Sequence, residues 1–246
     1  MPTTANLIRS LAACAAIALT LAASPARAHR PDDPTGRERT ARGSLVDVEV
    51  LVEGRTAPLY LAPGRCDRRY FEAFRGRDYA LRVRNRTGGR IGVLVSVDGL
   101  NVVDGRRSRQ GRDEAMYVLG PWESTTIRGW RTSLDEVRSF VFVDEQRSYA
   151  SRTGQANGDM GWIRVLAFEE RGARVIRPRS ACDRLDGGVG REQEAPSAAM
   201  EKSLAGRGAA ESFPGTGWGE RRQDRVAETW FVAAATPGDR LVLRYE

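Results

Sequence analysis

The chain has 246 residues, 39 Lys or Arg against 32 Asp or Glu, and a formal net charge of +7. Its single histidine, His29, lies in a charged stretch near the amino end. The rest of the sequence therefore lacks the imidazole of Ser-His-Asp, Cys-His and most zinc sites. The single lysine, Lys202, lies in a low-complexity stretch, which argues against Schiff-base chemistry. We predict no catalytic residue, no metal site and no cofactor.

Residues 1–28 have the pattern of a secretory signal peptide. Arg9 precedes an apolar run over residues 11–23, and Ala26 and Ala28 supply the small residues that signal peptidase recognises. We expect cleavage after Ala28 and a periplasmic or secreted product. Its formal charge falls from +7 to +5 because two arginines are removed. No later run has the length of a transmembrane helix, so none is expected after processing.

The leader has an alternative interpretation. Residues 11–14 spell a lipobox, in which Cys14 would be acylated and would anchor the protein to a membrane. A lipobox closes the apolar run, whereas here the run continues past Cys14. Cleavage after Ala28 is therefore favoured over anchoring.

Period-two alternation begins after a charged segment. Residues 29–43 contain no apolar run and predict a disordered tether. From Ser44 onward the valines at positions 46, 48, 50 and 52 are expected to point to one side, as a half-buried strand requires. Further strands are predicted at residues 57–62, 69–74, 78–85, 90–98, 115–119, 124–130, 138–143 and 161–169.

The connections between these strands carry their own signals. Residues 86–89 predict the turn of a hairpin, and the capping-box pattern from Thr132 to Glu136 predicts one helical turn. Residues 90–98 are apolar at almost every position, which is typical of a strand covered on both faces.

The last part of the chain changes composition twice. Residues 171–212 lose all alternation and predict a low-complexity loop or linker, with a brief helix near 197–205. Strand patterns return at 224–235 and 239–246, which we expect to form a hairpin docked on the main sheet. The sequence thus predicts an all-β protein, a single antiparallel β-sandwich domain built from residues 44–170 plus 213–246.

One segment holds the most distinctive polar residues. Asp98, Asn101 and Asp104 offer three oxygen-bearing side chains among glycines, which is compatible with a calcium loop. The spacing is not that of an EF-hand, and Asp-Gly pairs are common turn formers. We favour a structured turn in which the Asn101 side chain bonds to nearby backbone.

Arginines follow this turn directly. Arg106, Arg107, Arg109 and Arg112 carry guanidinium groups that match phosphate and carboxylate. We expect the loop from Asp98 to Arg112 to contact an anionic envelope polymer or another envelope protein, or else to be a solvated charged loop. Nucleic acid is not expected, because aromatic residues are not interleaved with these arginines.

Tryptophans suggest an alternative function. Trp122 and Trp218 are expected to be exposed, and a flat indole on a β-sandwich favours carbohydrate binding. Trp130, Trp162 and Trp230 are expected in the core. A hydrolase with paired carboxylates is a weaker alternative, because the spacing of the acids does not single out an acid and a nucleophile.

Two cysteines remain after processing, Cys66 and Cys182. In an oxidising compartment an even pair predicts a disulfide, which would tie the low-complexity segment to the domain. Two free thiols are the alternative.

Several segments resemble a group of exported bacterial proteins with no assigned activity. They are residues 81–106, 117–143 and 215–226, together with the closing strand. The resemblance supports a single exported domain and identifies no site residue. The sequence therefore favours a non-catalytic binding or structural protein of the envelope.

Overall fold

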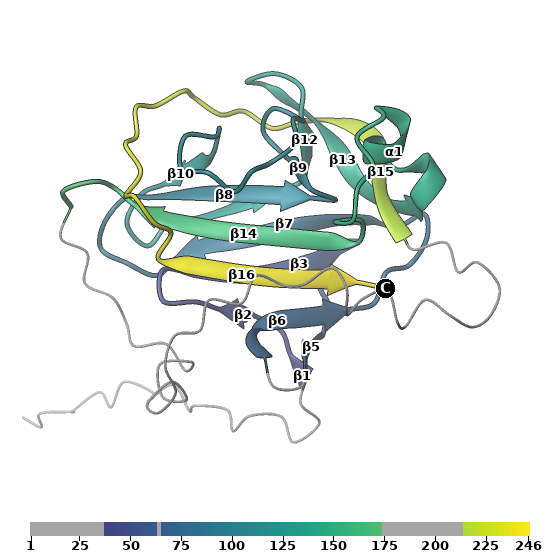
Figure 1. The fold of residues 1–246 in the computed structure, drawn as a ribbon, viewed down its shortest axis with the longest axis horizontal. Coiled ribbons are helices and arrows are strands. Elements are labelled where there is room, and N and C mark those ends of the chain that lie inside the picture. The colour runs from purple at the N-terminus through teal and green to yellow at the C-terminus, as the bar shows by residue number, and fades with distance from the viewer. Residues whose placement is uncertain (1–36, 63–64, 174–213) are drawn as a thin grey trace, which may run out of the picture. The chain divides into compact units, whose positions relative to one another are not determined.

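The computed structural model describes residues 37–62, 65–173 and 214–246 (Figure 1). The leader with Cys14, the first part of the tether, Cys182 and the low-complexity segment from residue 174 lie outside the described residues. Predictions made for those parts stay predictions. In the described residues almost all regular structure is β-strand, in two sheets that share one apolar core. The predicted all-β sandwich is confirmed.

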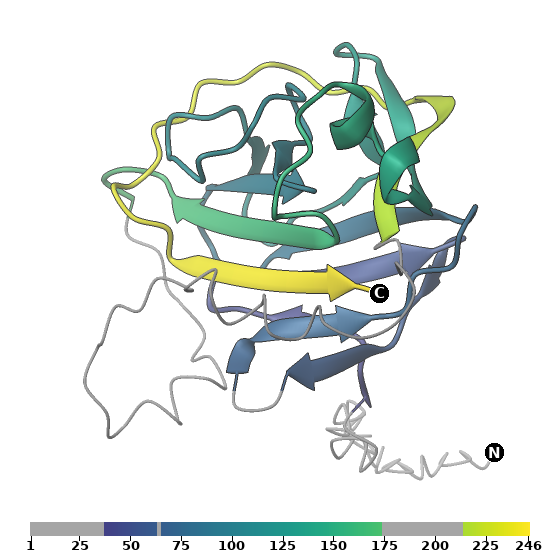
Figure 2. The ribbon, with the colours of Figure 1, turned by 45° about the vertical axis from the view of Figure 1, so that its right-hand side comes forward.

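The first sheet is mixed. Its order is β1 (Arg37–Glu38), β5 (Leu59–Ala62), β6 (Arg65–Phe71), β16 (Asp239–Tyr245), β14 (Trp162–Glu169), β8 (Ile91–Val97) and β10 (Tyr117–Leu119), with β9 (Leu100–Asn101) paired to β8. Figure 2 shows β16 between β14 and β6. The β16–β6 pair is parallel, whereas β16 and β14 are antiparallel, so the sheet departs from the purely antiparallel arrangement predicted.

The second sheet has short strands at its margins. Its main path is β12 (Gly129–Arg131), β13 (Glu136–Asp144), β7 (Asp78–Asn85), β3 (Val46–Val52) and β2 (Ala41–Arg42). Three strands pair beside this path, namely β11 (Ser124–Ile127) on β7, β15 (Pro214–Gln223) on β13 and β4 (Arg55–Thr56) on β3. A 3-10 turn η1 (Glu145–Arg147) and a short helix α1 (Tyr149–Arg152) connect β13 to β14.

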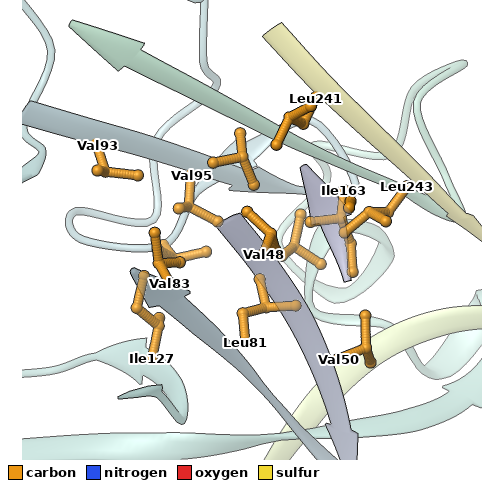
Figure 3. Packing of buried hydrophobic residues seen from close by; sticks show 14 of the residues in the cluster. Val48, Val50, Leu81, Val83, Val93, Val95, Ile127, Ile163, Leu241 and Leu243 are labelled. Carbon is orange, nitrogen blue, oxygen red and sulfur yellow. The ribbon is translucent and has the colours of Figure 1, made fainter. Parts of the chain in front are cut away.

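The core lies between the inner faces of the two sheets. The predicted alternation of β3 is confirmed, because Val46, Val48 and Val50 are fully buried. Figure 3 shows side chains of both sheets meeting there, among them Val48, Leu81, Val83, Val95, Ile163 and Leu241. Each buried side chain of this size contributes about 1.5–3 kcal/mol relative to exposure.

Strand β8 is buried on both faces, as its continuous apolar run predicts. Its outward Leu94 belongs to a second apolar cluster, covered by Phe231 of the segment that precedes β16. Gly92 permits this cover, because a β-carbon there would lie 2.5 Å from a ring carbon of Phe231.

Two predicted hairpins are wrong. Residues 86–89 connect β7 and β8, but these strands belong to different sheets. The buried Asn85 amide holds this connection by donating to the carbonyls of Gly89 and Gly120, each at 2.7 Å. The predicted closing hairpin also fails, because β16 pairs with β14 and β6.

Residues 224–235 form an extended strap rather than the predicted strand. The strap has one bridge to the first sheet, between Ala233 and Glu170. Its alternating apolar residues cover β8 instead of joining a ladder, which explains why the pattern resembles a strand. The Gly-rich residues 214–223, which lack such a pattern, form β15.

Two smaller predictions are also corrected. Of the capping-box residues, Thr132 lies in the turn after β12 and Glu136 begins β13, and the Thr132 hydroxyl donates to the Glu136 carbonyl at 3.2 Å. The helical turns follow β13 instead. Part of the predicted tether is ordered, because β1 and β2 lie within residues 37–42 and Ala41 is buried.

Candidate functional site

The loop predicted to bind a partner begins with a buried carboxylate. Asp98 is 0% exposed and follows β8 directly. Its Oδ1 accepts hydrogen bonds from the Gly161 amide at 2.9 Å and the Tyr245 hydroxyl at 2.6 Å. Its Oδ2 accepts from the Thr216 amide at 2.7 Å. Burial raises the pKa of Asp98 to about 6, although the three donors act in the opposite direction.

Three hydroxyl groups extend from this carboxylate across the core. The Thr216 hydroxyl lies 2.7 Å from that of Tyr245 and 2.6 Å from that of Tyr79. Each hydroxyl has one proton, so all three protons are used when Tyr79 donates to Thr216, Thr216 to Tyr245 and Tyr245 to Asp98. We call this set the buried polar chain. It joins β16 of the first sheet to β7 and β15 of the second.

Asp98 therefore has a structural position, and its predicted role as a surface contact does not agree with its burial. The residue adopts a left-handed backbone conformation, with φ of 51°, and Gly99 follows with φ of 78°. This turn reverses the chain into β9, which pairs with β8 and is also buried. The carboxylate oxygens face N–H and O–H donors. This is the environment of an anionic hydrogen-bond acceptor and not of a ligand to a cation.

Asn101 is also buried, at 1% exposure. Its Oδ1 accepts from the Val103 amide at 2.9 Å, and its amide donates to the Ala115 carbonyl at 2.8 Å. This side-chain turn confirms the favoured interpretation of the segment. Among the residues that the structure describes, no group of three His, Cys, Asp or Glu side chains is placed to hold a metal ion.

The exposed part of the loop is held by further side-chain bonds. Asp104 Oδ1 accepts from the Arg106 amide at 3.0 Å. Glu114 Oε1 accepts from the amides of Arg109 at 2.9 Å and Gly111 at 2.8 Å. These bonds engage the arginine backbone and leave the guanidinium groups outside the loop.

All four predicted arginines of the loop are exposed. Arg112 Nε lies 3.6 Å from a carboxylate oxygen of Asp113. The guanidinium groups of Arg106, Arg107 and Arg109 make no ion pair with any residue in the described ranges. Several arginines on the strands do have a carboxylate partner. Examples are Arg131 with Asp224, Arg222 with Asp78 and Arg82 with Glu49.

The two tryptophans predicted to be exposed are exposed, but they lie apart. Trp218, 45% exposed, pairs across β15 and β13 with the buried Phe140, and its ring stacks on Tyr149 at 4.9 Å. One of its faces is thus already covered. Trp122, 57% exposed, precedes β11 and lines a hollow on the second sheet. Neither ring joins the arginine loop.

The other tryptophans divide. Trp130 and Trp162 are 2% and 5% exposed, which confirms their predicted burial. Trp230 is 85% exposed, so its predicted core position is wrong. It lies in the strap, where Phe231 next to it covers β8 instead.

Three acids that a carboxylate-dependent hydrolase could use are in ion pairs or buried. Asp144 pairs with Arg75 at 2.6 Å, and Glu170 pairs with Arg90 at 3.0 Å. Asp98 lies in the core. The geometry therefore supports no acid and nucleophile pair among these three residues.

Three residues of the buried polar chain were not identified from the sequence. Tyr79 and Tyr245 occupy core positions of predicted strands, and a core tyrosine pattern does not show which acid its hydroxyl meets. Thr216 stands between two glycines, which gives no periodic signal.

The disulfide prediction, the membrane-span finding and the comparisons with known proteins identify no further site. Cys66 lies in β6, and its predicted partner is outside the described residues, so the disulfide stays a prediction. None of the helices in the described ranges has the length and apolar character needed to cross a bilayer. Searches against family models, curated proteins and solved structures give no match.

Proposed function

We propose that the protein is an exported, non-catalytic envelope protein that binds an anionic surface polymer through Arg106, Arg107 and Arg109. One observation carries the proposal. These three guanidinium groups belong to residues within a four-residue stretch, are exposed and make no ion pair within the described residues. Arg112 flanks them, with Asp113 beside it.

The unpaired state favours binding. An arginine already bonded to a carboxylate has to give up that bond before it can hold a ligand, whereas an unpaired guanidinium offers its donors directly. Phosphate and carboxylate match the planar fork of each group. A polymer that repeats such groups contacts several arginines at once.

The loop is also ordered before it binds. Asn101, Asp104 and Glu114 fix its backbone by side-chain bonds. Less conformational entropy is therefore lost when a partner binds than for a flexible loop. The long arginine side chains still have to become ordered.

Polyphosphate is a suitable probe for this site. The triple variant Arg106→Gln, Arg107→Gln, Arg109→Gln should bind it about tenfold or more weakly in a titration at low salt, and its affinity should depend less on ionic strength. The matched control is Arg55→Gln, Arg152→Gln, Arg240→Gln, which removes three charges from exposed arginines elsewhere. We expect the control to lose less than about threefold.

Two results would contradict the proposal. Equal losses in both variants would show that only net charge matters. Absence of polyphosphate binding by the wild-type protein at low salt would remove an anionic partner of this loop. An acidic envelope protein captured by the wild type, with no polymer binding, would assign the loop to a protein partner instead.

A further inference from the structure

A separate hollow of about 530 Å³ lies on the second sheet. Outward residues of β3 and β7 line it together with the segment that enters β11. Its lining includes Arg42, Asp47, Glu49, Arg84, Trp122 and Ser124. The arginine loop begins at β8 and β9 of the first sheet, so the hollow is a different surface.

Trp122 is held in an unusual conformation at this hollow. Its φ of 59° lies in the left-handed region, which a bulky residue rarely adopts. The turn is fixed on both sides of it. The Trp122 amide donates to the Thr87 carbonyl at 3.1 Å, and Glu123 Oε2 accepts from the Gly120 amide at 2.6 Å. A strained backbone that keeps a large ring exposed is typical of functional positions.

The polar groups around the ring have spare capacity. Arg42 and Arg84 are exposed and form no ion pair in the described part of the chain. Asp47 Oδ1 is buried and accepts no hydrogen bond, although it lies 3.4 Å from Arg86 Nε. The hollow therefore offers two cationic donors beside an aromatic face, whereas the unsatisfied Asp47 oxygen lies beneath its surface.

We propose that this hollow binds a saccharide unit that carries a carboxylate. The exposed indole of Trp122 offers a flat apolar face for the C–H groups of a pyranose ring. The guanidinium groups of Arg42 and Arg84 match the carboxylate. Thr40 and Ser124 add hydroxyl groups at the margin.

The acids of the hollow select among anions. Asp47 and Glu49 both line it, so a compact dianion such as phosphate would meet two carboxylates. A sugar acid places its single charge at one end and neutral hydroxyls elsewhere. This distribution fits a site that holds arginines and acids together.

Trigalacturonate is the probe, measured by calorimetric titration against the neutral trisaccharide cellotriose. Trp122→Gly should weaken trigalacturonate binding at least tenfold, and glycine tolerates the left-handed φ, so the fold should be retained. The matched control Trp230→Gly removes a more exposed tryptophan outside the hollow and should change affinity less than twofold. Arg84→Gln should weaken trigalacturonate about fivefold and leave any cellotriose binding unchanged.

Several results would overturn the inference. They are absence of saturable trigalacturonate binding by the wild type, equal binding by Trp122→Gly and wild type, or displacement of trigalacturonate by equimolar phosphate. The triple arginine variant of the loop separates this site from the proposed function. It should lose polyphosphate binding and keep trigalacturonate binding, and loss of both would place the sugar acid on the loop.

Discussion

Two Asp-Gly pairs in one loop have opposite environments. Asp98 before Gly99 is fully buried and accepts three hydrogen bonds. Asp104 before Gly105 is exposed, and its carboxylate accepts a hydrogen bond from the Arg106 amide. Both glycines have positive φ, whereas of the two aspartates only Asp98 does.

The difference arises from what lies nearby in space. Asp98 follows β8, which is buried on both faces, and its donors come from Gly161, Thr216 and Tyr245. Those residues are 63 or more positions away in the chain. An Asp-Gly pair thus specifies a bend, and distant strands decide whether the carboxylate is structural or solvated.

Substitution of Asp98 and of Asp104 should give the largest expected difference in the free energy of unfolding. Asp98→Ala leaves three buried donors without an acceptor and should lower the free energy of unfolding by about 3 kcal/mol or more. Asp104→Ala should change it by about 0.5 kcal/mol or less. Urea denaturation of both variants measures this. Similar losses in the two variants would contradict the distinction.

The buried Asp98 carboxyl should also make stability depend on pH. The pKa of Asp98 is raised to about 6 in the folded state, so the unfolded chain releases this proton first as pH increases. Stability from this group is highest below about pH 4 and falls by roughly 3 kcal/mol as pH rises to about 6. Unfolding midpoints from pH 4 to 7 for wild type and Asp98→Asn test this. An identical pH profile in both would refute it.

Substitutions of the two tyrosines in the buried polar chain should cause smaller losses of stability, which depend on the distance from Asp98. Tyr245→Phe removes a donor to the carboxylate and should cost about 2 kcal/mol, whereas Tyr79→Phe removes a neutral bond and should cost about 1 kcal/mol. The Tyr245 change should also move the acid titration of stability to higher pH, because Asp98 loses a donor. A larger loss for Tyr79→Phe would show that the chain does not end on Asp98.

The strands could largely be predicted, but their partners could not. Alternation in β3 and the apolar run of β8 both reflect burial, which the residue types record directly. The assignment of β7 and β8 to different sheets depends on Asn85, whose amide reaches carbonyls on two loops. Strand β15 has little apolar pattern, because its glycines pack closely against neighbours such as Val143 and Ser139.

The sequence predicts which residues of the candidate site are exposed, but it does not predict how the backbone and tertiary contacts arrange them. Exposure of Arg106, Arg107 and Arg109 and of Trp122 follows from polar or turn surroundings in the sequence. The left-handed φ of Trp122 and the buried Asp47 Oδ1, which accepts no hydrogen bond, both result from tertiary contacts. No local pattern encodes them.

Strand β16 has a consequence for the order of folding. Residues 239–245 form the strand between β6 and β14, and Tyr245 also supplies the hydroxyl that reaches Asp98. The first sheet is therefore incomplete until residues 239–245 have been synthesised. Its early strand β6 pairs with a neighbour that is made about 170 residues later. Until then β6 and β14 each have an unpaired edge on the side that β16 occupies.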